Sequence, residues 1–60
     1  MRVYVNHQPV DILPRMTVRH ALLSAGLLGE IAAGKKVYDE WGHEVGLEGA
    51  LFEGAKIFVK

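Results

Sequence analysis

The 60-residue sequence contains no cysteine, which excludes a disulfide framework, a thiolate zinc site and a cysteine-ligated iron–sulfur cluster. Neither sign of charge is in excess, because seven Lys and Arg residues balance seven Asp and Glu residues. This balance argues against a dedicated nucleic-acid-binding protein, which normally carries a basic excess. No apolar run approaches the roughly 20 residues that cross a bilayer, and no signal-peptide core is visible. We therefore expect a cytoplasmic protein without membrane contact.

The composition is that of a small folded domain. Half of the residues are hydrophobic and 23% are charged, which is too apolar for a disordered tail. A chain of this length buries only about 60% of its unfolded surface. We therefore expect one domain over residues 1–60, with a small core.

Hydrophobic alternation predicts two strands at the start of the chain. Met1, Val3 and Val5 alternate with polar or larger residues, which is typical of a half-buried strand. The turn-forming residues 6–9 follow, and the alternation resumes over residues 10–13. The two segments predict a β-hairpin.

A short helix is predicted next. Thr17 is a good N-cap residue, and Gly26 can supply the left-handed residue that ends a helix. His20 occupies the position where a capping box has Glu or Gln, so we expect that box to be incomplete. One helical stripe is apolar, and its members are Val18, Ala21, Leu22 and Ala25.

The second half predicts a loop and shorter strands. Residues 29–35 predict a loop anchored by Ile31, and residues 36–39 predict a strand followed by a tight turn with Gly42 at positive φ. Residues 43–45 predict a returning strand. Residues 46–54 predict a glycine-punctuated crossover, and residues 56–60 predict a last strand.

These elements predict an α+β fold in the order ββαβ(β)β, with a mixed sheet of four or five strands and one helix packed across it. The first and last strands would run parallel as the central pair, joined by a right-handed crossover. The expected core follows from the apolar faces of the elements. It comprises Val3, Val5, Val10, Ile12, Val18, Leu22, Ala25, Leu28, Val37, Leu51, Ile57 and Val59.

This layout resembles the β-grasp, or ubiquitin-like, fold, and its pattern is most similar to the sulfur-carrier proteins of thiamine and molybdopterin biosynthesis. The resemblance rests on a strand ending at Asn6, on Thr17-Val18 opening the helix, and on the segment from Leu51 to Val59. It covers essentially the whole chain. Its motifs are fold-level patterns, which indicate fold more strongly than function.

The resemblance implies three alternative functions, and the sequence differs from the family pattern in two of them. Sulfur carriers act through a flexible tail ending in Gly-Gly, whereas this sequence ends at Lys60, so we expect no carrier activity unless a tail is supplied otherwise. The ferredoxins that share the topology hold their cluster on four cysteines, which are absent here. TGS-type domains are also similar in shape, and a TGS-like RNA- or nucleotide-sensing module would bind RNA through Lys56 and Lys60.

No residue pattern predicts an enzyme, a metal site or a cofactor. The three histidines lack ligand spacing, and the polar residues around the 39–44 turn are better explained as solvated loop residues. No phosphate-loop pattern is present. Ser24 has only His20 as a nearby base, four residues earlier on the same helix. We therefore predict no catalytic residues, no metal and no cofactor.

The strongest functional pattern lies on the outward side of the predicted sheet. Side chains of a strand alternate between the two sides of the sheet, so the first and last predicted strands each direct aromatic and basic side chains away from the helix. Its members are Arg2, Tyr4, Lys56, Phe58 and Lys60. Aromatic and Arg side chains are enriched at protein interfaces, although cross-strand pairing alone would also explain them.

Trp41 stands at the tip of the predicted turn. Our first expectation is that it folds back onto the edge of the core, and the alternative is an exposed contact. The sequence thus favours a small non-catalytic module that binds a protein partner through its open sheet face and Trp41. The sulfur-carrier-like and TGS-like functions remain as alternatives.

Overall fold

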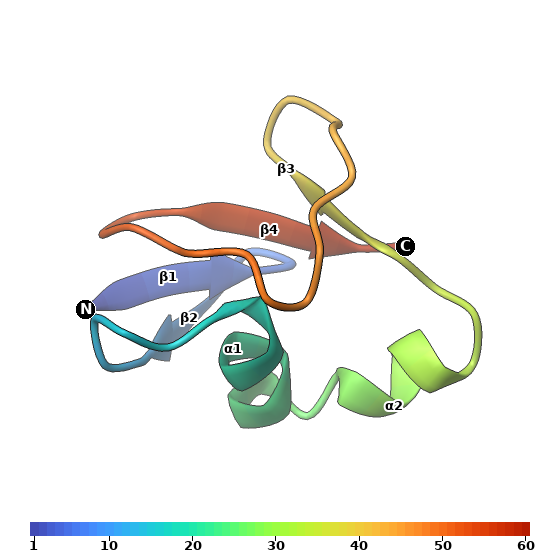
Figure 1. Cartoon of the computed structure of the whole chain (residues 1–60), viewed down its shortest axis with the longest axis horizontal. Coiled ribbons are helices and arrows are strands. Elements are labelled where there is room, and N and C mark those ends of the chain that lie inside the picture. The colour runs from blue at the N-terminus through green and yellow to red at the C-terminus, as the bar shows by residue number, and fades with distance from the viewer.

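The computed structural model describes residues 1–60 and contains four strands and two short helices (Figure 1). Neither helix has the length and hydropathy that a membrane-spanning helix requires. In chain order the elements are β1 (Arg2–Val5), β2 (Gln8–Asp11), α1 (Val18–Ala25), α2 (Leu28–Ala32), β3 (Val37–Asp39) and β4 (Lys56–Val59).

The four strands form one mixed sheet in the order β2-β1-β4-β3. The central strands β1 and β4 run parallel, and each outer strand is antiparallel to its neighbour. Both helices lie on the same side of the sheet (Figure 1). The predicted α+β class and the central parallel pair are therefore confirmed, and the arrangement is compatible with a β-grasp-like fold.

The hairpin between β1 and β2 is tighter than the sequence predicts. Val5 pairs directly with Gln8, so the loop contains only Asn6 and His7, whose φ angles are 49° and 71°. Two consecutive positive φ angles are typical of the type I′ turn, which matches the twist of paired strands. As a result β2 begins at Gln8, and the predicted start at residue 10 is wrong.

Helix α1 begins and ends where the sequence predicts, but its N-terminal cap is more complete than expected. The backbone N–H of Thr17 donates to Nδ1 of His20 at 3.1 Å, so the histidine takes the role that Glu or Gln has in a capping box. The prediction of an incomplete box is wrong because a neutral imidazole nitrogen accepts a hydrogen bond as a carboxylate oxygen does. Gly26 ends the helix at φ 74°.

Two predictions for the second half of the chain are wrong. Residues 28–32 form the single-turn helix α2, which overlaps the segment 29–35 that is expected to be a loop, and one turn is too short to show helical periodicity. Partly buried Leu28 and Ile31 pack it against the core. The expected strand 43–45 is reduced to one bridge between Tyr38 and Glu44, and the sheet has four strands.

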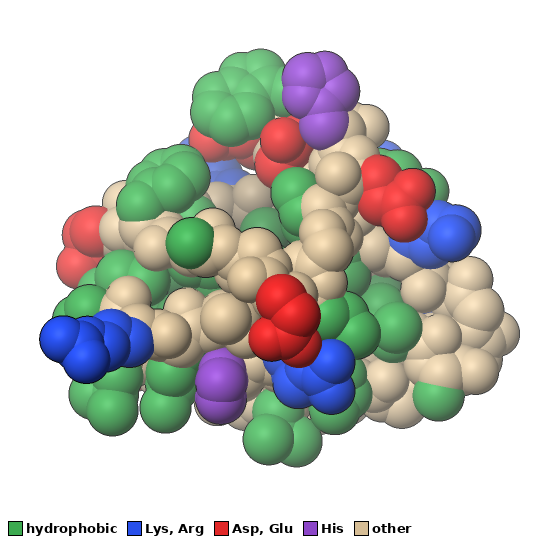
Figure 2. Space-filling model, in the orientation of Figure 1, with side chains coloured by type: hydrophobic (Ala, Val, Ile, Leu, Met, Phe, Trp, Pro, Cys, Tyr) green, Lys and Arg blue, Asp and Glu red, His purple; other side chains and the backbone are tan.

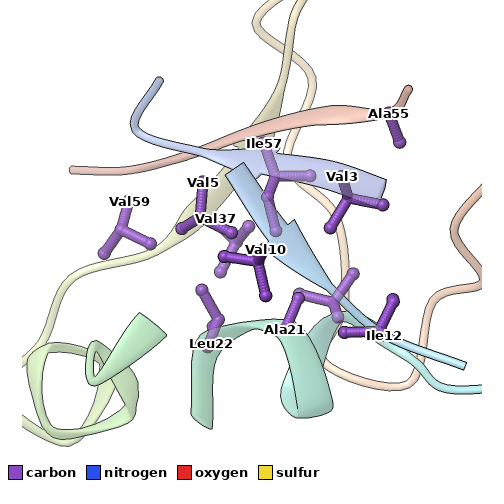
Figure 3. Packing of buried hydrophobic residues seen from close by; sticks show 11 residues of the cluster. Val3, Val5, Val10, Ile12, Ala21, Leu22, Val37, Ala55, Ile57 and Val59 are labelled. Carbon is purple, nitrogen blue, oxygen red and sulfur yellow. The ribbon is translucent and has the colours of Figure 1, made fainter. Parts of the chain in front are cut away.

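The core lies between the sheet and α1, where side chains from the strands point toward the helix (Figure 3). Ala25, Leu28 and Leu51 of the expected core are only partly buried, because each lies at an element end or in a loop at the margin of a small core. Ala21 and Ala55 are buried although the predicted core omits them. The buried residues are Val3, Val5, Val10, Ile12, Val18, Ala21, Leu22, Val37, Ala55, Ile57 and Val59.

Candidate functional site

The side of the sheet opposite the helices carries no covering layer (Figure 1), and we call it the open face. Strands β1 and β4 each alternate between buried and more exposed residues. Because Val3, Val5, Ile57 and Val59 are buried, their neighbours in the strands lie on the open face. The structure thus brings together five of the six residues that the sequence singles out, namely Arg2, Tyr4, Lys56, Phe58 and Lys60.

Three aromatic residues from three strands, Tyr4, Phe58 and Tyr38, lie on the open face, and we call them the aromatic row. Phe58 on β4 lies directly opposite Tyr38 on β3, and Tyr4 on β1 lies opposite Lys56 on β4. All three aromatic side chains belong to partly buried residues. The ring of His7 meets Phe58 edge-on, with ring centres 5.3 Å apart and an interplanar angle of 66°.

Tyr38 and His7 are members of this surface that the sequence analysis missed. Tyr38 follows buried Val37 on β3, so it points to the other side of the sheet. The sequence pattern could therefore predict Tyr38 on the open face if β3 is known to lie next to β4. The position of His7 depends on its left-handed φ of 71°, for which the sequence carries no comparable signal.

The cations of the open face differ in their surroundings. Arg2 Nε lies 3.1 Å from Asp11 Oδ1, and hydrogen bonding with Coulombic attraction raises the pKa of Arg2 and lowers the pKa of Asp11. Lys60 Nζ lies 5.6 Å from the centre of the Tyr38 ring, within the range of a cation–π contact. Lys56 forms no ion pair. The cations of the open face that are not held in an ion pair are therefore the two lysines.

The two outer strands are protected from pairing with another chain. Pro9 on β2 lacks a backbone N–H, and proline on an edge strand blocks strand addition. On β3, the N–H of Asp39 donates to the carbonyl of His43, and the carbonyl of Val37 accepts from Val45. The chain's own loop therefore covers most of the β3 edge.

Trp41 is 70% exposed, so the expectation that it folds back onto the core is wrong. The physical reason lies in the turn that holds it. Asp39 Oδ1 accepts the backbone N–H groups of both Trp41 and His43 at 2.9 Å, and Gly42 takes a φ of 83°. This turn lifts residues 40–43 away from the sheet (Figure 1).

A groove lies beneath this turn, between it and the crossover that leads into β4. We call it the loop groove. It has a volume of about 150 Å³ and a mostly apolar lining that includes Trp41, Leu51 and Phe52. Phe52 is 59% exposed. Figure 2 shows hydrophobic side chains standing at the raised loop and on the crossover, with the surface hollowed between them.

The loop groove is a second surface, and the sequence does not predict it. The sequence pattern indicates Trp41 as a candidate contact but places Phe52 only in a crossover. Its exposure depends on the path of residues 46–55, which form no regular element apart from an isolated bridge. Periodicity could not have assigned this side chain to a face.

The polar residues form no recognisable catalytic or metal-binding arrangement. Ser24 and His20 share no hydrogen bond, since His20 is engaged with Thr17. His43 Nδ1 lies 3.8 Å from Asp39 Oδ2, but no group of three or more potential ligands gathers to hold a metal ion.

Comparison of the chain with protein-family models, curated proteins and solved structures gives no match.

Proposed function

We propose that this chain is a β-grasp interaction module that binds a protein partner through its open face. The observation that carries the proposal is the aromatic row of Tyr4, Phe58 and Tyr38, which spans three strands on the side of the sheet without helices. A row of this kind offers a rigid apolar contact, because aromatic side chains lose little conformational freedom on binding.

The charge pattern indicates the kind of partner. The aromatic centre is flanked by Lys56 and Lys60, neither of which forms an ion pair. The Lys60 ammonium group lies over the Tyr38 ring. An apolar centre with a charged rim is the usual anatomy of a protein interface. A complementary partner would present an apolar patch with carboxylates at its margin, and it would bind more weakly at high salt.

The protected edges of β2 and β3 support binding through side chains of the face. Pro9 disfavours strand pairing at one edge, and the 43–45 loop occupies the other. Contact through the open face leaves both edges as they are. It also leaves the helix layer and its core untouched.

Phe58→Ala and Tyr4→Ala test this proposal. Each removes part of the aromatic centre without opening the core, because the buried side chains lie on the other side of the sheet. We expect each variant to lower the affinity for a captured partner at least about tenfold, as loss of an interface hot spot does. Capture from cells of the source organism, followed by titration with the purified partner, measures the effect.

Leu23→Ala is the matched control, because Leu23 is 63% exposed on α1 in the helix layer. It should leave partner capture unchanged. If Phe58→Ala, Tyr4→Ala and Leu23→Ala all retain the same partners at the same affinity, the open face is not the binding surface.

A further inference from the structure

The protection of the sheet edge has one gap, which lies at the start of β4. Strand β3 pairs with β4 only as far as Asp39, opposite Ile57. The chain then turns away at Glu40, and no hydrogen bond joins Glu40 to Lys56. The first residue of β4 therefore has no neighbouring strand on the β3 side.

The hydrogen-bond pattern shows which way the backbone of Lys56 faces. On the β1 side, Tyr4 N–H donates to Ala55 O and Asn6 N–H donates to Ile57 O, so the bonded carbonyls on that side come from the residues before and after Lys56. On the β3 side, Lys36 and Lys60 exchange both backbone bonds. Backbone groups of alternate residues in a strand face the same side. Lys56 lies four residues before Lys60, so its N–H and C=O also face the β3 side, where they have no partner.

The loop groove lies beside this unpaired backbone. Lys56 and Ile57 line it together with Val18, Trp41 and Phe52. Its volume of about 150 Å³ is comparable with an apolar cavity that holds one benzene ring. The groove is therefore the right size for one large apolar side chain.

We propose that the loop groove and the Lys56 backbone together form a docking site for an extended peptide segment of a partner protein. The segment runs antiparallel to β4. It occupies the position that β3 would fill if it continued past Asp39. One of its residues exchanges two backbone hydrogen bonds with Lys56. The adjacent residue points to the opposite side of the sheet, the side of buried Ile57, and places a Leu or Phe side chain in the groove between Trp41 and Phe52.

This combination is the general mode of strand addition, in which main-chain bonds supply affinity and a side-chain pocket supplies specificity. The exposure of Trp41 and Phe52, at 70% and 59%, is explained if both rings close over the anchor side chain. The site is separate from the aromatic row, so it extends the binding function to a second surface.

A peptide titration followed by amide and indole NMR signals tests the proposal. The probe is acetyl-Thr-Thr-Leu-Thr-Thr-amide, with one comparison peptide carrying Asp in place of Leu and another N-methylated at both flanking threonines. We expect the Leu peptide to move the Lys56 amide signal downfield and to shift the Trp41 indole signal. The Asp and N-methyl peptides should bind at least about tenfold more weakly, since each removes one of the two recognition elements.

Variants separate this site from the open face. Trp41→Ala should weaken the Leu peptide about tenfold, whereas Leu23→Ala and Phe58→Ala should leave its affinity unchanged. The proposal is overturned if the Lys56 amide does not respond to the Leu peptide, or if the Asp peptide binds equally well. Movement of the Lys56 signal with protein concentration alone would assign the groove to a second copy of this chain and would also overturn it.

Discussion

The two faces of the sheet are built from the same strands but differ in what they contribute. The inner face is a layer of valine and isoleucine side chains that are 0% to 8% exposed beneath α1. The outer face carries partly exposed aromatic rings and the exposed Arg2–Asp11 ion pair. Full burial of one aliphatic side chain stabilises a fold by about 1.5–3 kcal/mol, whereas an exposed ion pair contributes about 0–1 kcal/mol. Folding free energy is thus concentrated on the inner face, which leaves the outer face available for binding.

The largest effect is expected where the inner face meets the helix. Leu22 is 0% exposed and is the largest fully buried side chain, so Leu22→Ala should lower the free energy of unfolding by about 2–5 kcal/mol. A small domain is stabilised by only about 5–15 kcal/mol in total, so much of the population could unfold. Thermal and urea unfolding measure the change.

Leu23→Ala is the matched control for this prediction, because it makes the same substitution at the next residue, which is 63% exposed. Its effect should stay within about 0.5 kcal/mol. Equal effects of the two variants would contradict the contrast between a buried and an exposed side of α1.

The contrast between the two faces could be predicted from the sequence because it depends on period-two alternation. Val3 and Val5 alternate with Arg2 and Tyr4 in the printed order, and a strand with one buried face has only one register that buries the valines. The same holds for β4. The parallel pairing of the first and last strands also followed, because a crossover helix must cover the sheet that it connects.

The features that could not be predicted have no repeating pattern. Helix α2 has five residues, and its stability comes from the packing of Leu28 and Ile31 rather than from helix propensity. The loop groove is formed where residues 40–43 leave the sheet, and Asp39 Oδ1 fixes that departure by accepting the backbone N–H groups of Trp41 and His43. Such single contacts depend on tertiary structure, which periodicity does not encode.

An intermediate effect is expected at Asn6, which joins the ends of β1 and β4. Its Oδ1 accepts the backbone N–H of Val59 at 2.9 Å across 53 residues of sequence, and its φ is 49°. Asn6→Gly keeps the positive φ accessible but removes the acceptor, and it should cost about 1 kcal/mol. Asn6→Ala adds backbone strain and should cost about 2 kcal/mol.

Asn6→Asp is the control for Asn6, since it retains an acceptor oxygen and tolerates the left-handed conformation. Urea unfolding should rank the three variants with Asp closest to the parent chain, then Gly, then Ala. If Asn6→Gly is as stable as the parent chain, the side-chain bond to Val59 contributes nothing to stability.

The smallest effect is expected on the outer face, at the ion pair between Arg2 and Asp11. The hydrogen bond and the charge of Arg2 lower the pKa of Asp11 below its ordinary value of 3.8. The stabilisation is therefore present above pH 3.8 and is lost as the pH falls through the lowered pKa of the folded state. Both side chains are well exposed. The decrease in the free energy of unfolding at low pH should therefore be small compared with the effect of Leu22→Ala.

Titration of the Asp11 carboxyl by NMR measures this prediction directly. Arg2→Gln, or roughly 1 M NaCl, should return the pKa of Asp11 toward 3.8, because each removes or screens the same charge. Arg19→Gln should not, since Arg19 pairs with Glu48 instead. If Arg2→Gln leaves the pKa unchanged, the ion pair does not form in solution. The outer face would then carry Arg2 as a third cation without an ion pair.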